Sequence, residues 1–266
     1  MSSPAQDAPH AGPRRQDVGR RDIRNGALAL GLAPGDVAMV HSSLSSFGHV
    51  AGGPDAVIDG LLEALGPEGT LVLPTFTWGA FHAAERVEFD VAGTPCETGI
   101  IPETFRQRPD VARSVHLCHS VAALGPLTDQ MLGDGISPFG AGSPFDALLR
   151  HDGWIVFLGV SCQCCTALHA VEEFVGVPYR AYRDFEGSVV IHPDGSRQAS
   201  KSTEYLRQET GSNDFAKMEA LFEEAGVLHR THIGSARCLA IRIRHIFEVA
   251  RPRLERNAGF LTAHSS

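Results

Sequence analysis

The residues with the clearest potential for chemistry are a histidine and a glutamate three positions apart, His169 and Glu172. In a helix this spacing brings the two side chains together on one face. A carboxylate that is hydrogen-bonded to one imidazole nitrogen fixes the tautomer of the ring and stabilises the imidazolium, while the other nitrogen accepts a proton. The pair is therefore a candidate general base that removes a proton from a substrate amine. The alternative is a first-turn histidine followed by two ordinary surface glutamates, Glu172 and Glu173.

A buried strand and a short loop precede this pair. Residues 154–160 form an apolar run typical of a strand that is buried on both faces, and helical spacing begins after Thr166, a suitable N-cap. The histidine and the glutamate would then lie just beyond the carboxyl end of a strand. Open α/β sheets place their functional sites at that edge.

A second predicted strand, at residues 37–40, ends in a polar loop. The loop carries an imidazole and several hydroxyl groups, from His41, Ser42, Ser43 and Ser45. A helix predicted at 53–65 and a strand at 70–74 follow, an order that predicts parallel strands in a right-handed unit. Hydroxyl and N–H groups between a strand and a helix can hold an anion, although the glycine motifs of nucleotide-binding loops are absent. An ordinary polar loop is the alternative.

Two further stretches could contribute to a site. Residues 75–109 are irregular and rich in aromatic residues, Trp78 among them, and form either the wall of a substrate pocket or a surface insertion. Arg113 and Ser114 precede an apolar alternating strand that runs to about residue 125. The guanidinium makes them a second anion-binding candidate. His116 and His119 are interpreted as packed histidines of that strand.

The remaining pattern completes an α/β chain. A hairpin is predicted at 187–192 with its partner near 197–201, a helix at 214–225, a strand at 236–243, and a C-terminal helix at 245–256 interrupted at Pro252. We therefore predict a mixed, largely parallel central sheet flanked by helices, with a C-terminal antiparallel hairpin. Residues 1–16 are predicted to be a disordered leader and residues 17–266 a single domain.

The charge and the apolar pattern restrict the class of partner. The net charge is −8, which argues against nucleic acids and anionic membranes as partners and fits a neutral or cationic small molecule. No stretch is apolar for long enough to span a bilayer, and no apolar segment of a secretory signal follows the N-terminal arginines. We therefore expect a cytoplasmic protein that is a monomer or a homodimer.

The six cysteines do not form the pattern of a disulfide framework. Cys162, Cys164 and Cys165 are clustered near His169, but their spacing differs from the paired ligands of structural zinc sites. A metal site is therefore a minority hypothesis. A hydrolase with a nucleophilic cysteine in this loop is another.

Taken in order, these segments resemble the aminoglycoside 3-N-acetyltransferase family, antibiotic acetyltransferases that are unrelated to the GNAT fold. The resemblance covers roughly residues 18 to 250. It rests on the joint order and spacing of short motifs at 40–44 with 52–54, 69–76, 99–106, 113–116 with 119–123, 143–145, and 158–160 with 166–172.

The resemblance implies an enzyme that transfers acetyl directly from acetyl-CoA to an amine of an aminoglycoside, without a metal. His169 is then the general base and Glu172 orients it. The cofactor-binding positions that the resemblance implies are His41, Ser42, Ser43, Ser45, Arg113 and Ser114. The acceptor positions are Trp78, Glu173 and Asp214. Acylation of a different amine by the same chemistry stays open.

Overall fold

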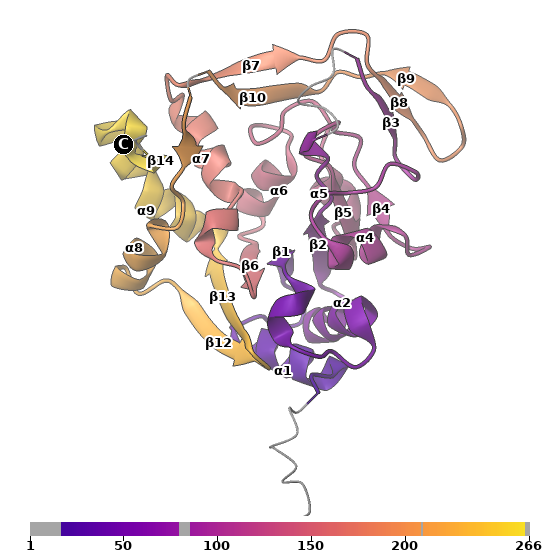
Figure 1. Ribbon diagram of the computed structural model, residues 1–266, viewed down its shortest axis with the longest axis vertical. Coiled ribbons are helices and arrows are strands. Elements are labelled where there is room, and N and C mark those ends of the chain that lie inside the picture. Colours follow the sequence, from indigo (N-terminus) through magenta and orange to yellow (C-terminus); the bar gives the residue numbers. More distant parts are fainter. Residues whose placement is uncertain (1–16, 80–85, 209, 264–266) are drawn as a thin grey trace, which may run out of the picture.

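The computed structural model describes residues 17–79, 86–208 and 210–263, and a mixed sheet lies at its centre (Figure 1). The strands of this sheet follow the order β12, β13, β6, β1, β2, β5 and β4. Their bounds are β1 Val37–Ser42, β2 Thr70–Pro74, β4 Ala112–Arg113, β5 Val121–Leu124, β6 Trp154–Leu158, β12 His229–Ile233 and β13 Ala236–Arg242. The leader predicted at residues 1–16 lies outside the described residues.

Parallel pairing is confined to the middle of the sheet. Strand β1 pairs in parallel with both β2 and β6, and the other neighbours pair antiparallel. The mixed α/β class is confirmed, and its parallel part is smaller than the sequence suggested. A crossover helix permits the parallel β1–β2 pair, whereas the two-residue turn of Gly234 and Ser235 forces β12 and β13 to be antiparallel.

Helices cover both faces of the sheet. One face packs against α1 Arg20–Ala29, α2 Gly53–Leu65 and α4 Ile100–Arg106. The other packs against α5 Thr128–Leu132, α6 Pro144–Arg150, α7 Ala167–Val175, α8 Met218–Glu224 and α9 Ile243–Arg256. Among the described residues, no helix combines the length and the apolar character needed to cross a membrane.

The alternation along β1 decides where its last residues point. Val37 and Met39 belong to the core under α7, whereas Ala38 and Val40 belong to the core under α2. Because successive side chains of a strand face opposite sides, the strand directs His41 towards the α7 side and Ser42 towards the α2 side. One strand end thus contributes to both faces of the sheet.

Smaller strand pairs lie at the edge of the molecule (Figure 1). They are β3 Glu88–Asp90 with β8 Val189–Ile191 and β9 Arg197–Ala199, β7 Arg180–Asp184 with β10 Thr203–Arg207, and β11 Ser212–Asn213 with β14 Thr262–Ala263. The antiparallel β8–β9 pair confirms the predicted hairpin. The 75–109 stretch is less irregular than predicted, since it contains β3 and α4.

The structure differs from two predictions about where an element is interrupted. The strand expected after Arg113 is divided into β4 and β5, because residues 114–120 turn back and His116 Nδ1 accepts the N–H groups of Cys118 and His119 at 3.2 and 3.0 Å. His116 and His119 therefore lie in a turn. Helix α9 continues through Pro252, where burial of Ile246, Ala250 and other residues of its apolar face outweighs the lost hydrogen bond.

Candidate active site

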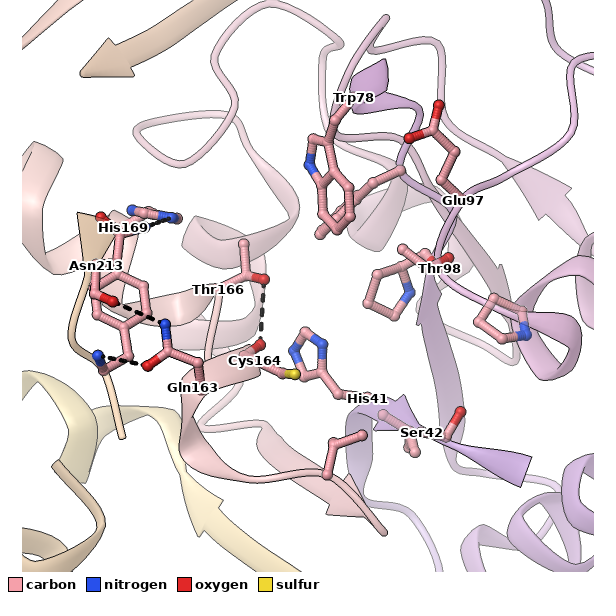
Figure 2. Close-up of a pocket in the computed structure, with 16 residues that line it drawn as sticks. His41, Ser42, Trp78, Glu97, Thr98, Gln163, Cys164, Thr166, His169 and Asn213 are labelled. Carbon is pink, nitrogen blue, oxygen red and sulfur yellow. Dashed lines mark hydrogen bonds between the residues drawn. The ribbon is translucent and has the colours of Figure 1, made fainter. Parts of the chain in front are cut away.

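A pocket of about 380 Å³ opens at the carboxyl ends of β1 and β6 (Figure 2). Its lining combines residues from the end of β1, the loop after β2, the start of α7 and strand β11. They include His41, Ser42, Trp78, Cys164, His169 and Asn213. The structure therefore brings together three segments that the sequence analysis had considered separately, the residues around 41, 78 and 169.

A sharp turn after β6 leads the chain into this pocket. Gly159 has φ +71, and a Cβ there would lie 2.3 Å from the Cβ of Ser46. Ser46 also donates its hydroxyl proton to the Gly159 carbonyl at 2.8 Å. The short 3-10 helix η2 Cys162–Cys164 follows, and Thr166 occupies the N-cap position of α7 as predicted, although its hydroxyl does not cap the helix.

His169 and Glu172 form a close pair on α7, with His169 Nδ1 2.5 Å from Glu172 Oε2. Glu172 is fully buried, accepts the hydroxyl proton of Tyr179 at 2.6 Å, and forms an ion pair with Arg180, whose Nε lies 2.8 Å away. Burial raises the pKa of Glu172, but the hydrogen bond with His169, the charge of Arg180 and the hydrogen bond from Tyr179 outweigh it, so the pKa lies below its usual value. The carboxylate is therefore ionised and held in one orientation.

The second nitrogen of His169 faces the pocket. Asn213 Oδ1 accepts hydrogen bonds from Arg180 at 2.9 Å and Arg207 at 2.6 Å, which assigns the amide orientation from the network. Its Nδ2 then lies 3.5 Å from His169 Nε2. Because Nδ2 only donates, the network favours the tautomer with the proton on Nδ1 and a free electron pair on Nε2.

Aromatic rings set the protonation state of His169. Phe139 and Phe215 pack on the imidazole, with ring centroids 5.1 and 4.8 Å away. Burial lowers the pKa of His169 below 6.5, although Glu172 acts in the opposite direction. The ring is therefore neutral near pH 7 and can accept a proton on Nε2.

His41 and Ser42 each present a buried polar atom without a partner. The His41 ring stacks on Phe157 with centroids 5.6 Å apart, and burial lowers its pKa to about 4. His41 Nε2 and Ser42 Oγ are buried and have no hydrogen-bond partner among the described residues. Unpaired buried polar groups are costly, so both atoms are suited to bonding a ligand in the pocket.

A neighbouring pocket of about 590 Å³ lies on the α2 side of β1. Ser42 lines both pockets, and Ser43, Ser45, Gly53 and Ile101 line only this one. Ser43 Oγ lies 3.3 Å from Ser45 Oγ. The predicted hydroxyl cluster therefore surrounds an open cavity beside the start of α2.

Arg113 and Ser114 line none of the pockets around His41 and His169, so their assignment to cofactor binding gains no support from the structure and stays a prediction. Arg113 is buried, and its guanidinium donates to the carbonyl oxygens of Thr75, Val91 and Thr94 and lies over the ring of Phe89. Ser114 Oγ accepts the N–H of Val121 at 2.9 Å. Internal bonds thus occupy both side chains in this structure.

The three predicted acceptor residues have different surroundings. Trp78 lines the pocket and is 39% exposed. Asp214 lies outside the pocket lining and pairs with Lys217 at 3.2 Å. Glu173 also lies outside the pocket lining and accepts the hydroxyl proton of Ser137 at 3.0 Å. The geometry therefore argues against acceptor contacts by Asp214 and Glu173.

A third pocket, of about 430 Å³, lies on the other side of His169. It shares Trp78, His169 and Asn213 with the first pocket. Sequence reasoning missed Asn213 and the two arginines that bind its oxygen. No local pattern marks them, because Asn213 is 44 residues from His169 along the chain. They meet the base only through the pairing of β7, β10 and β11 with their partners.

The cysteine hypotheses lose support in the structure. Cys162 and Cys165 are buried, and burial raises the pKa of all three clustered thiols, that of Cys162 to about 11. A thiol of raised pKa is a poor nucleophile near pH 7. In residues 17–79, 86–208 and 210–263, no group of three His, Cys, Asp or Glu side chains could hold a metal ion.

Comparison with known proteins agrees with this geometry. The model of the aminoglycoside 3-N-acetyltransferase family matches residues 39–255. Aminoglycoside N(3)-acetyltransferase IV from Salmonella sp. is 32% identical over 234 residues, which cover 86% of this chain and 85% of the relative.

Solved structures lead to the same family. A complex of coenzyme A with AAC-IIIb has a TM-score of 0.81 and 25% identity, and covers 94% of this chain and all of the other. A histidine-to-alanine variant of AAC(3)-IVa in complex with a gentamicin has a TM-score of 0.78 and 28% identity, and covers 94% and 93% of the two chains. On its sequence, its fold and its His–Glu pocket, this chain belongs to the aminoglycoside 3-N-acetyltransferase family.

Proposed function

We propose that this protein transfers the acetyl group of acetyl-CoA to the 3-amino group of an aminoglycoside, and that it does so in the cytoplasm as a resistance enzyme. The observation that carries the proposal is the His169–Glu172 pair, whose free Nε2 opens on two joined pockets. The residues from 17 to 266 act as a single acetyltransferase domain. The single-domain assignment is supported because one central sheet packs against both large hydrophobic cores, one on each face.

Acetyl-CoA enters across the carboxyl end of β1. Ser43 and Ser45 on the α2 side bind the polar part of the cofactor, and Ser42 lies where the two pockets meet. The pantetheine arm then crosses the strand end and places the thioester on the α7 side. The buried, unpartnered Ser42 Oγ fits this path, because a ligand amide would supply the missing hydrogen bond.

His169 acts as the general base. It removes a proton from the acceptor nitrogen as that nitrogen attacks the thioester carbonyl, and Glu172 stabilises the imidazolium. A carbon–nitrogen bond forms, the carbon–sulfur bond breaks, and the imidazolium returns its proton to the departing sulfur. The two pockets hold both substrates in line, so no covalent intermediate on the enzyme is needed.

His41 stabilises the developing oxyanion. Its neutral ring can carry a proton on Nε2, and this buried atom has no partner in the described part of the chain. A donor fixed in position before the reaction stabilises charge that appears only in the transition state. His41 lies on the α7 side of β1 because of the strand alternation described above.

Trp78 and Glu97 provide the acceptor contacts. The indole offers a flat apolar face for a sugar ring, and Glu97 lines the same pocket and accepts the backbone N–H of Gly79 at 2.8 Å (Figure 2). A carboxylate at this position favours ammonium groups. The positive charge of Arg180 repels these ammonium groups only weakly, because Arg180 forms an ion pair with Glu172.

Steady-state assays with acetyl-CoA and a panel of acceptors test the proposal. Thiol release should accompany acetylation of aminoglycosides that contain deoxystreptamine, and mass spectrometry with NMR should place the acetyl group on the 3-amino nitrogen. Expression in a sensitive bacterium should raise the inhibitory concentration of the same compounds. If no deoxystreptamine compound is acetylated while another amine is, the aminoglycoside assignment is wrong.

A further inference from the structure

A second imidazole–carboxylate pair lies behind Trp78 and has no part in the reaction described above. His119 comes from the turn before β5 and Glu204 from β10, and they are only 6% and 2% exposed. Both line the third pocket together with Trp78 and His169. A buried pair of this kind beside an active site calls for a role.

The partners of His119 determine its tautomer. Trp78 Nε1 donates to His119 Nε2 at 3.3 Å. An indole N–H can only donate, so His119 Nε2 carries the electron pair and the proton lies on Nδ1. Nδ1 is 3.2 Å from Glu204 Oε2, although the two atoms are not aligned as a good hydrogen bond. The chain of contacts therefore runs from Glu204 through His119 to the indole.

The His119 ring is also fixed on its sides. Phe76 and Phe139 pack edge-on to it, with centroids 4.9 and 4.7 Å away, and Phe139 in turn contacts the ring of His169 at 5.1 Å. Trp78 is 39% exposed, far more than His119 at 6%. Phe76 also packs against the indole, with ring centroids 5.4 Å apart, but the partial exposure of the residue means that the bond of its N–H contributes to its orientation.

We propose that Glu204 and His119 are positioning residues that hold the indole of Trp78 as the wall shared by the first and third pockets. Glu204 orients the imidazole, and the imidazole accepts the indole proton. The acceptor then meets a preformed flat face instead of a rotating side chain, which lowers the cost of binding it. This role rests on the acceptor site described under the proposed function.

A double-mutant cycle, measured by steady-state kinetics, tests whether the hydrogen bond between His119 and Trp78 affects binding of the acceptor. His119→Phe keeps the ring packing but removes the acceptor atom, and Trp78→Phe removes the donor from an exposed residue. Each should raise the acceptor KM roughly threefold to tenfold, the worth of one neutral hydrogen bond, with kcat within about twofold. Together they should cost no more than either alone. His119→Gln, whose carbonyl can accept the indole proton, should restore part of the loss.

A fluorescence measurement tests the link without any substrate. The sequence has two tryptophans, so Trp154→Phe leaves Trp78 as the sole reporter. In that background His119→Phe should increase the quenching of Trp78 by acrylamide, because the released indole swings into solvent. This arm is independent of the acceptor, so it remains decisive even if no aminoglycoside is acetylated.

The chain offers a matched control in His229, whose ring contacts Trp154 at 5.1 Å outside the pockets described above. His229→Gln should change neither the acceptor KM nor the quenching of Trp78. Additive costs in the double variant would overturn the proposal. So would an unchanged acceptor KM and unchanged quenching in a His119→Phe protein that has merely lost thermal stability.

Discussion

Two imidazole–carboxylate pairs lie beside the same cavity, and the second nitrogens of their imidazoles have different partners. His169 Nδ1 lies 2.5 Å from its carboxylate, and its Nε2 faces an amide at 3.5 Å and open space. His119 Nδ1 lies 3.2 Å from its carboxylate, and an indole N–H closes its Nε2 at 3.3 Å. We therefore propose that the same two chemical groups act as a base in one place and as a positioning support in the other.

The comparison shows that a carboxylate alone does not make a histidine a base. Both carboxylates are buried, but the histidine side chains are 16% and 7% exposed. A base needs an unprotonated nitrogen that a substrate can reach. His169 lines both the first and the third pocket, and its Nε2 has a long contact of 3.5 Å with the Asn213 amide, whereas His119 lines the third pocket and its Nε2 accepts the indole proton at 3.3 Å.

The largest expected difference between the pairs follows removal of each ring. His169→Ala should lower kcat by roughly 10²–10⁴-fold, the usual worth of a general base, with the affinity for acetyl-CoA nearly unchanged. His119→Phe should act mainly on the acceptor KM. Steady-state kinetics and calorimetry with acetyl-CoA measure both effects. A His169→Ala enzyme with near-normal kcat would show that His169 is not the general base.

Replacing the carboxylates should give a smaller difference. Glu172→Gln should lower kcat about 10–10²-fold, because His169 remains but loses the charge that stabilises its protonated form. It should also destabilise the fold by about 3–5 kcal/mol, since Arg180 is left without its buried partner. Glu204→Gln should leave kcat within about twofold. Equal losses of kcat in the two variants would show that both pairs handle protons.

The pH dependence sharpens the assignment of the base. The pKa of His169 lies below 6.5, so the active neutral ring predominates above that pKa and kcat/KM should fall as the pH drops through it. Below the pKa the loss is about tenfold per pH unit. Glu172→Gln should move this limb to still lower pH, because Glu172 raises the pKa. A limb that moves with the amine pKa of the acceptor belongs to the acceptor instead.

The smallest expected effect is that of Cys164→Ser. Cys164 lines the first pocket near His41, but burial raises the pKa of its thiol. The serine variant should keep kcat and both KM values within about twofold. A loss comparable with that of His169→Ala would transfer the chemistry from the imidazole to the thiol.

Local patterns predicted the elements that carry the site. The apolar run before Gly159 became β6, Thr166 became the N-cap of α7, and the residues from Gly53 to Leu65 became α2 with Gly66 at its end. These features depend on neighbours within one turn or one strand. The division of the 113–125 strand was missed, because the turn that divides it is held by the ring of His116 and by the Thr203 carbonyl of β10.

The assignment of charged residues was least reliable. Arg113 has the type and the position of a phosphate ligand in the sequence, but Thr75, Val91 and Thr94 take its donors. Asp214 was assigned as an acceptor contact from the family resemblance and pairs with Lys217, whereas its uncharged neighbour Asn213 faces His169. A long polar side chain finds its partner through tertiary distance, which residue type does not encode.

The sequence by itself determined the family, and it determined the pairing of His169 with Glu172, because residues three apart in a helix share a face. It also determined that His41 and Ser42 end a buried strand. Only the tertiary structure decided which nitrogens are free, which arginines are already bound and how Asn213, Trp78, His119 and Glu204 gather around His169. Those contacts join segments that are distant along the chain, and they depend on how the strands pair.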